Sequence, residues 1–180
     1  MQDSIEYEGR ILNIDIELTR KNILKNGGVF VKKQLFKRYV FNTIPAKPGE
    51  WLRLRTDGET STLTYKKIKH NGIDGTVEYE VAVDDFELTY KILNSVGFAH
   101  KGYQENEREL FIISGEEVSL DSWPRINTYL EIEAKNKQAV EDLAVKIGFD
   151  VSQITGDNTQ AIYMAEGIDI DHIETLKFED

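Results

Sequence analysis

The chain has 180 residues, contains no cysteine and carries a formal net charge of −10. The length fits one domain, residues 1–180, with a sizeable core, and the missing cysteine excludes disulfides, thiol catalysis and zinc–thiolate sites. The acidic balance argues against sequence-independent nucleic-acid binding, which needs a basic face. No apolar run approaches the roughly 20 residues of a membrane span, and the polar N-terminus does not resemble a signal peptide. We therefore expect a cytoplasmic protein without nucleic-acid or membrane partners.

The first half of the chain predicts strands around one helix. The opening run IEYEGRI predicts a strand, and a helix is expected over residues 16–26, capped by Asp15 and stopped by Gly27 and Gly28. Further strands are expected in the runs EWLRLRT, STLTYKKIK and TVEYEVAV. Asn71-Gly72 favours a hairpin between the last two runs.

The second half predicts three more helices. The first covers residues 86–96, with Asp84 or Asp85 as its cap, and the second runs from the cap Asn136 to Gly148. A less regular pattern predicts a short helix over residues 157–166. Strands are expected in ERELFII, EEVSLDSW and TYLEIEAK, with a break at Pro124. The elements together indicate an α+β domain dominated by an antiparallel sheet.

Most of these strands carry apolar residues on one face and charged residues on the other, because alternate side chains of a strand point to opposite faces. On the opening strand, Glu6, Glu8 and Arg10 share one face. The later strands place on their charged faces Arg53, Arg55, Lys66, Glu78, Glu80, Arg108, Asp121, Glu131 and Glu133.

Two interpretations of this charged face remain open. It could be the solvated face of a sheet whose other face is covered by helices. However, the acids form Glu-x-Glu pairs on three strands and the arginines form Arg-x-Arg on a fourth, and adjacent like charges repel unless something neutralises them. A barrel with a charged interior would hold a divalent cation against the acids and a polyanion against the arginines, with helices on its apolar outside.

The motifs on these strands resemble the CYTH family, also called triphosphate tunnel metalloenzymes. EYEGR is similar to the family's ExExK motif, and LRLR, LTYKK, EYEV, ENERE and LDSWPRINTYLEIEA follow in the family's order over about residues 4–150. Residues 150–180 carry no motif of the family. The resemblance implies an eight-stranded antiparallel β-barrel with a charged tunnel for a triphosphate and with helices packed on the outside.

The resemblance also implies roles for the charged residues. One or two divalent cations, Mg²⁺ or Mn²⁺, would be held by Glu6, Glu8, Asp121, Glu131 and Glu133. The triphosphate would be bound by Arg10, Arg53, Arg55, Lys66 and Arg108, with Arg10 and Lys66 as the expected catalytic residues. Glu78 and Glu80 would orient the basic residues. This division fits the chemistry, because hard cations prefer carboxylate oxygens and arginine grips phosphate through two parallel hydrogen bonds.

The function implied is metal-dependent hydrolysis of tripolyphosphate, ATP or thiamine triphosphate. Two alternatives stay open: a class IV adenylyl cyclase that forms cyclic AMP and pyrophosphate, and a triphosphate binder without activity. Arg10 stands where the family motif has lysine, and arginine cannot readily lose a proton to act as a base. Its effect on turnover, and the formation of a homodimer, are left open.

Several residues to which the resemblance gives no role have two possible placements. A solvated face, or else the tunnel entrance, is expected for the basic cluster Lys32, Lys33, Lys37 and Arg38. Lys101 precedes Arg108 by an odd number of residues, so both face the interior only if a bulge or bend intervenes. Trp51 and Trp123 are expected to pack in the core or line the rim.

Overall fold

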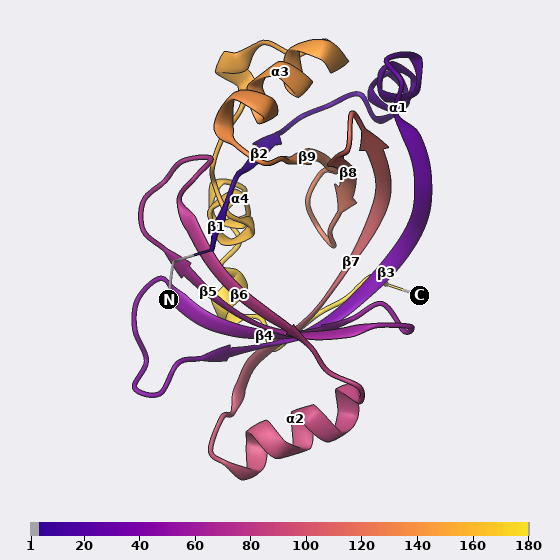
Figure 1. Ribbon diagram of the computed structural model, residues 1–180. Helices are drawn as coiled ribbons and strands as arrows, with labels where there is room; N and C mark the ends of the chain where they lie inside the picture. Colours follow the sequence, from indigo (N-terminus) through magenta and orange to yellow (C-terminus); the bar gives the residue numbers. More distant parts are fainter. Residues whose placement is uncertain (1–3, 180) are drawn as a thin grey trace.

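The expected strands form and join into one sheet in the computed structural model, which describes residues 4–179 (Figure 1). The strands are β1 (Ile5–Glu6), β2 (Glu8–Ile11), β3 (Val29–Asn42), β4 (Glu50–Thr56), β5 (Ser61–Ile68), β6 (Thr76–Ala82), β7 (His100–Ile113), β8 (Glu116–Ser122), β9 (Tyr129–Glu133) and β10 (Thr175–Leu176). Neighbouring strands are antiparallel, except that the short β10 runs parallel to β7.

The N-terminal segment closes the sheet into a barrel. The strand order is β1-β6-β5-β4-β3-β7-β8-β9-β2, so the first and last strands are consecutive in the chain. β1 pairs with β6 through Ile5 and Val77, whereas β2 pairs with β9 through Glu8 and Glu133. The chain changes partner at Tyr7, whose carbonyl accepts a hydrogen bond of 3.0 Å from the Ala134 amide. The predicted barrel is confirmed, but the described residues give ten strands rather than eight, because the opening strand divides and β10 is added.

Two strands are long, and β7 extends well beyond the run ERELFII that predicted it. β3 and β7 each have 14 residues and pair along most of their length, from Val29 opposite Ile112 to Phe41 opposite His100. The expected hairpin between β5 and β6 also forms. Its loop spans residues 69–75 rather than the two residues of Asn71-Gly72, and the loop is held by a bond of 2.8 Å from the Lys69 amide to the Gly75 carbonyl.

The four expected helices form, and the three helices for which a cap was predicted have that cap. They are α1 (Ile16–Lys25), α2 (Phe86–Ser95), α3 (Lys137–Ile147) and α4 (Thr159–Ala165). The capping side chains of Asp15, Asp85 and Asn136 each accept a hydrogen bond from a backbone amide of the first turn. α4 is shorter than expected because Asn158 is its cap. None of the helices among residues 4–179 is long and apolar enough to cross a membrane.

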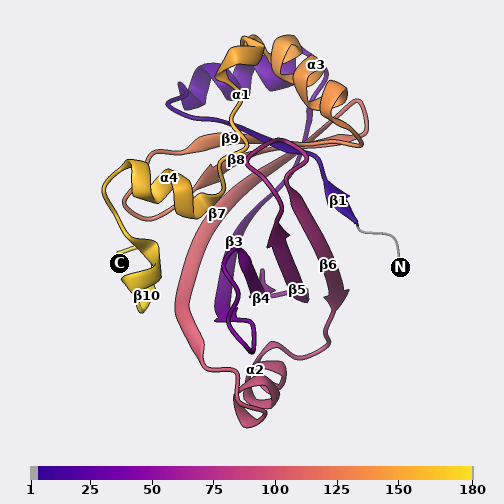
Figure 2. The same cartoon turned by 90° about the vertical axis from the view of Figure 1, so that its left-hand side faces the viewer.

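The helices cover apolar outer faces of the barrel (Figure 2). α1 and α3 pack over β2, β7, β8 and β9, where the largest core cluster includes Ile23, Val118, Leu130 and Val140. α2 lies at the opposite end and buries Leu93 against β3 and β4. α4 packs with β10 around Tyr163. The apolar faces of the strands therefore point outward, where the helices cover most of them and leave residues such as Val29, Leu35 and Val81 exposed, and the charged faces line the interior.

Gly9, the fourth residue of EYEGR, faces the outside of the barrel and packs against α3 and Ile154. A Cβ atom placed on Gly9 would come within 2.7 Å of Ile154 Cγ2 and 2.8 Å of Val140 Cγ1. Contacts this short do not occur between real side chains, so β2 can approach α3 this closely only because residue 9 has no side chain. Glycine at position 9 therefore determines how closely the closing strand β2 packs against α3.

We expect Gly9→Ala to lower the free energy of unfolding by about 1–3 kcal/mol, because an added methyl overpacks this contact. The measurement is urea unfolding followed by circular dichroism. Val140→Ala removes one of the two clashing groups, so the double variant should be less destabilised than the sum of the single variants. Strict additivity of the two changes would show that the contact is not the cause.

Candidate active site

A cavity of about 390 Å³ lies inside the barrel, and its lining includes residues from each of β1–β9. This volume is within the range of small-molecule sites, about 300–1,000 Å³. The charged residues selected from the sequence all line it, and they are Glu6, Glu8, Arg10, Arg53, Arg55, Lys66, Glu78, Glu80, Arg108, Asp121, Glu131 and Glu133. The shared face of each strand thus becomes one wall of a single tunnel. Their roles in binding or catalysis remain proposals.

Arg10 is the centre of an acidic region in the tunnel. Its Nε donates to Glu131 Oε2 at 2.9 Å, its Nη1 donates to the Asp157 carbonyl at 2.8 Å, and its Nη2 contacts Glu8. Although burial favours the neutral guanidine, Glu8 and Glu131 hold the pKa of Arg10 above its ordinary value. A lysine has one nitrogen and could not reach these three partners at once in the same way. Arginine at this position therefore also ties the closing strand to β9 and to the C-terminal segment, residues 150–179.

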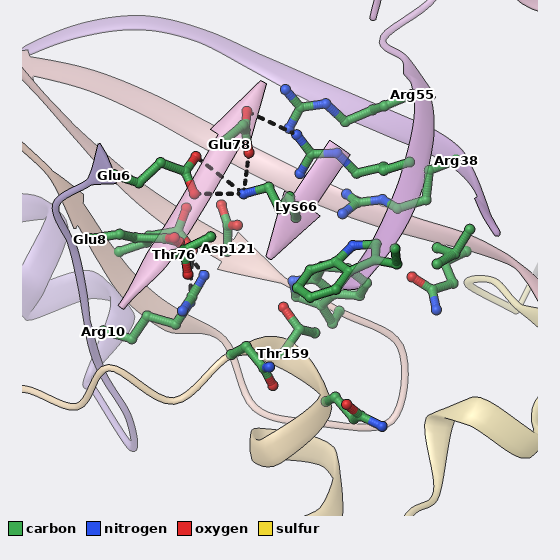
Figure 3. Close-up of a pocket in the computed structure, with 18 of the residues that line it drawn as sticks. Glu6, Glu8, Arg10, Arg38, Arg55, Lys66, Thr76, Glu78, Asp121 and Thr159 are labelled. Carbon is green, nitrogen blue, oxygen red and sulfur yellow. Dashed lines mark hydrogen bonds and ion pairs between the residues drawn. The ribbon is translucent and has the colours of Figure 1, made fainter. Parts of the chain in front are cut away.

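Arg108 and Lys66 are likewise paired with acids. Arg108 makes two hydrogen bonds of 2.7 Å to the Asp121 carboxylate and also contacts Glu131. Lys66 Nζ lies 3.0 Å from Glu6 Oε2 and 2.5 Å from Glu78 Oε2 (Figure 3). The structure therefore joins Asp121, expected as a metal ligand, to Arg108, expected as a phosphate ligand.

In the acidic region around Arg10 there are more carboxylates than basic side chains to neutralise them. Burial and the neighbouring Glu131 raise the pKa of Glu8 to about 8, against the pull of Arg10. Burial also raises the pKa of Glu6 to about 7, although Lys66 lowers it. The pKa of Glu133 is raised by burial and by repulsion from Glu131. These carboxylates are crowded enough that adding positive charge would stabilise them.

The basic residues of β3 and β4 form a second region, here called the arginine cluster, made of Arg38, Arg53 and Arg55. Figure 3 shows Arg38 and Arg55 across the cavity from Glu8 and Arg10. Arg53 lies 3.3 Å from Glu80, and Arg55 lies 3.9 Å from the same carboxylate. These separations are longer than those of well-formed ion pairs, about 2.7–2.9 Å. The arginine cluster is thus only partly neutralised.

Arg38 does not lie on the solvated face that was one of the two placements expected for the basic cluster; it lies in the tunnel, which is closer to the alternative. It is only 7% exposed and lines the cavity, whereas Lys37 points outward and is exposed. Arg38 shares its face of the strand with Phe36 and Val40. The alternation rule therefore assigns this face as apolar, and Arg38 is not selected with the charged faces. A single cation between apolar residues of the same face was the sequence feature that could have revealed it.

Lys101 faces the interior together with Arg108, because the strand contains the bulge that this arrangement requires. The pairing of β3 with β7 shifts between Val40 opposite Gly102 and Phe41 opposite His100, so Lys101 is the extra residue of a bulge. The bulge turns its side chain to the tunnel lining, where Nζ lies 2.7 Å from Asp171 Oδ1.

The C-terminal segment also contributes to the lining, through residues that no motif indicated. They are Asn158, Thr159, Gln160, Ile170 and Asp171. Gln160 donates to Asp171 at 2.5 Å, and β10 fixes the end of the segment on β7. The segment therefore covers part of the tunnel.

Trp51 and Trp123 line the cavity as well, and Trp123 is buried.

Comparison with known proteins agrees with this architecture. Residues 4–160 match the CYTH domain family, and no curated protein sequence is significantly similar to the chain. The solved structure of the PH1012 protein from Pyrococcus horikoshii OT3 has the same fold, with a TM-score of 0.74 at 20% identity over 85% of this chain and 96% of that chain.

Two further structures carry a functional description. A candidate adenylate cyclase from Vibrio parahaemolyticus superposes with a TM-score of 0.75 at 11% identity, over 91% of this chain and 99% of that chain. A candidate adenylyl cyclase from Hippeastrum, with a dominant triphosphatase activity, superposes with a TM-score of 0.61 at 14% identity, over 91% and 96% of the two chains. Because the family match spans most of its length, this chain belongs to the CYTH family.

Proposed function

We propose that this protein hydrolyses a triphosphate inside the tunnel with the help of a divalent metal ion. The observation that carries the proposal is the presence, in one cavity, of a partly neutralised arginine cluster facing a crowded set of acids. Water would attack the terminal phosphorus, the bond to the bridging oxygen would break, and orthophosphate and the shortened chain would leave. Phosphoryl transfer of this kind depends mainly on positioning and charge neutralisation.

The basic residues supply the phosphate contacts in this proposal. Arg53 reaches Glu80 through Nη2 at 3.3 Å and Arg55 approaches the same carboxylate only to 3.9 Å, so both guanidinium groups keep donors that Glu80 does not use. Arginine matches phosphate oxygens with paired donors. Arg10 and Lys66 lie beside the acids, where they would neutralise charge on oxygens close to the reacting phosphorus.

The acids fit a hard divalent cation such as Mg²⁺ or Mn²⁺. Glu8 lies opposite Glu133 in the pairing of β2 with β9, and Arg10 lies opposite Glu131, so the three carboxylates come from adjacent positions. In residues 4–179 no three acidic or histidine side chains converge as a ready-made metal cage. This suits Mg²⁺, which binds through one or two carboxylates and keeps waters and substrate phosphates as its other ligands. When bound, the metal would neutralise phosphate charge and orient water.

A class IV adenylyl cyclase is the second candidate, and the observation that favours it is Trp51. The Trp51 indole lines the tunnel opposite Lys66 in the pairing of β4 with β5, where it could stack on a purine base. Trp123 is less suited to this role, since the Arg38 guanidinium lies 4.5 Å from its ring centre. The products separate the candidates, because a cyclase releases pyrophosphate and cyclic AMP.

The first test is turnover with Mg²⁺ or Mn²⁺, measured as orthophosphate, pyrophosphate and cyclic AMP released from tripolyphosphate and ATP. We expect orthophosphate from the parent, and at least about a hundredfold loss of kcat/KM in Arg10→Ala because a preorganised charge contact is removed. Arg10→Lys keeps the charge and should stay within about tenfold, or 1.4 kcal/mol. Lys37→Ala is the control with an exposed cation removed. Turnover of Arg10→Ala at the parent's rate would disprove the proposed site.

The second test concerns the metal. Mg²⁺ or Mn²⁺ should raise the Tm of the parent, and tripolyphosphate should raise it further, because ligands that bind only the folded state stabilise it. Glu133 makes no ion pair within the described part of the chain, so Glu133→Gln should fold normally and lose more than half of the metal-dependent rise. Glu59→Gln, in an exposed turn, is the matched control. A full metal response in Glu133→Gln would place the metal elsewhere.

The third test uses pH. The pKa of Glu8 is raised from 4.5 to about 8 on folding, so the folded state binds more protons than the unfolded chain between these values. The free energy of unfolding of the metal-free protein should therefore fall as pH rises through this range. Glu8→Gln should make this slope shallower, and Glu59→Gln should not. The measurement is urea unfolding at pH 5, 6, 7 and 8 in EDTA, and an unchanged slope in Glu8→Gln would refute the crowding of these acids.

A further inference from the structure

Arg38 is a buried cation without a carboxylate partner. Within the described part of the chain no acidic side chain lies within 4.0 Å of it. The Nε atoms of both Arg38 and Arg53 are buried and have no hydrogen-bond acceptor. An uncompensated buried charge destabilises a fold, and an orphaned donor adds to this. Two such donors from adjacent strands, in a cavity that is otherwise rich in ion pairs, indicate an acceptor that comes from outside the protein.

The charges around Arg38 strengthen this inference. Burial lowers the pKa of Arg38 well below its ordinary value, and repulsion by Arg53 and Arg55 lowers it further. Asp121 attracts Arg38 but offsets only part of this, because Asp121 already accepts two hydrogen bonds from Arg108. An anion placed among the three guanidinium groups would remove the repulsion and accept from the free donors.

Two neighbours hold the Arg38 guanidinium in position. Asn106 is 1% exposed and accepts a hydrogen bond from Nη2 through its side-chain oxygen. The guanidinium carbon lies 4.5 Å from the centre of the Trp123 ring, a favourable cation–π contact. Asn106 is neutral and Trp123 has no formal charge, so both fix the direction of the group without neutralising it. A buried arginine with a purely structural role would be expected to pair with a carboxylate.

We propose that Arg38, Arg53 and Arg55 form an anion subsite that binds one phosphoryl group of the substrate without a metal ion, with Arg38 as a substrate-binding residue positioned by Asn106 and Trp123. The subsite rests on the proposed triphosphate site, but it does not require that the triphosphate is turned over. It lies across the cavity from the acids around Glu8 (Figure 3). Part of the affinity for a triphosphate would therefore persist after the metal is removed.

The test measures tripolyphosphate binding by calorimetry in EDTA, for the parent, Arg38→Met, Arg38→Lys and the control Lys37→Met. The control removes an exposed cation next to Arg38 on the same strand, so it changes the net charge equally. We expect Arg38→Met to weaken binding at least tenfold and Arg38→Lys to lie between Met and the parent, because lysine keeps the charge but not the paired donors. Lys37→Met should bind like the parent.

Melting temperatures of the ligand-free variants separate binding from a structural role. Because Arg38→Met removes an uncompensated buried charge, its Tm should equal or exceed that of the parent. Parent-like binding in Arg38→Met overturns the proposal. So does a lowered Tm with equal losses of binding in the Met and Lys variants, which would make Arg38 structural. A parent that does not bind tripolyphosphate in EDTA also overturns it, even if turnover occurs with metal. A parent that binds in EDTA but never releases phosphate refutes the hydrolase and leaves the subsite standing.

Discussion

Closure of the sheet by the N-terminal segment is the constraint on which the rest of the structure depends. β1 completes the pairing on β6 and β2 completes it on β9, so the inner faces of all the strands β1–β9 border one small space. Charges brought into such a space lose part of their hydration and are stable only if they are paired. The sequence places many charges there, and their pairing therefore decides both the stability and the binding properties of the tunnel.

The pairing is uneven along the tunnel, and this unevenness gives the site its chemical character. On one side, Arg10, Arg108 and Lys66 are each matched by carboxylates, yet Glu8 and Glu6 are still crowded. On the other, Arg53 and Arg55 approach Glu80 and Glu78 at 3.3–3.9 Å, and Arg38 has no carboxylate within 4.0 Å among the described residues. One side thus favours an added cation and the other an added anion. A metal–polyphosphate complex carries both, and its binding would relieve strain that the ligand-free fold retains.

The structural neighbours show that this barrel persists at 11–20% sequence identity. Alternation of apolar and charged residues is enough to specify which face of each strand meets the helices, and many residue combinations satisfy it. The chemistry depends on particular side chains at particular inner positions, so related barrels can host different reactions. In this chain, Arg10 beside Glu8 and Glu131 and Arg38 against Trp123 are such inner side chains.

The sequence by itself determined the local structure and the membership of the tunnel wall. Caps and apolar stripes placed all four helices to within about two residues, because these features act within a few turns. The two-residue period of a strand assigned each charged side chain to a face. Once the sheet closed, the charged residues chosen by this rule all lined one cavity, and the alternative of a half-solvated sheet was excluded.

Only the tertiary structure decided how those residues meet. The change of partner at Tyr7, the bulge at Lys101 and the covering C-terminal segment all depend on pairings between residues far apart in the chain. Arg38 was grouped with a basic cluster because it follows Lys37 directly in the sequence, and its burial depends on β7 and Trp123, which pack against it. Period and composition are local properties, whereas the neutralisation of a charge depends on which distant side chain arrives beside it.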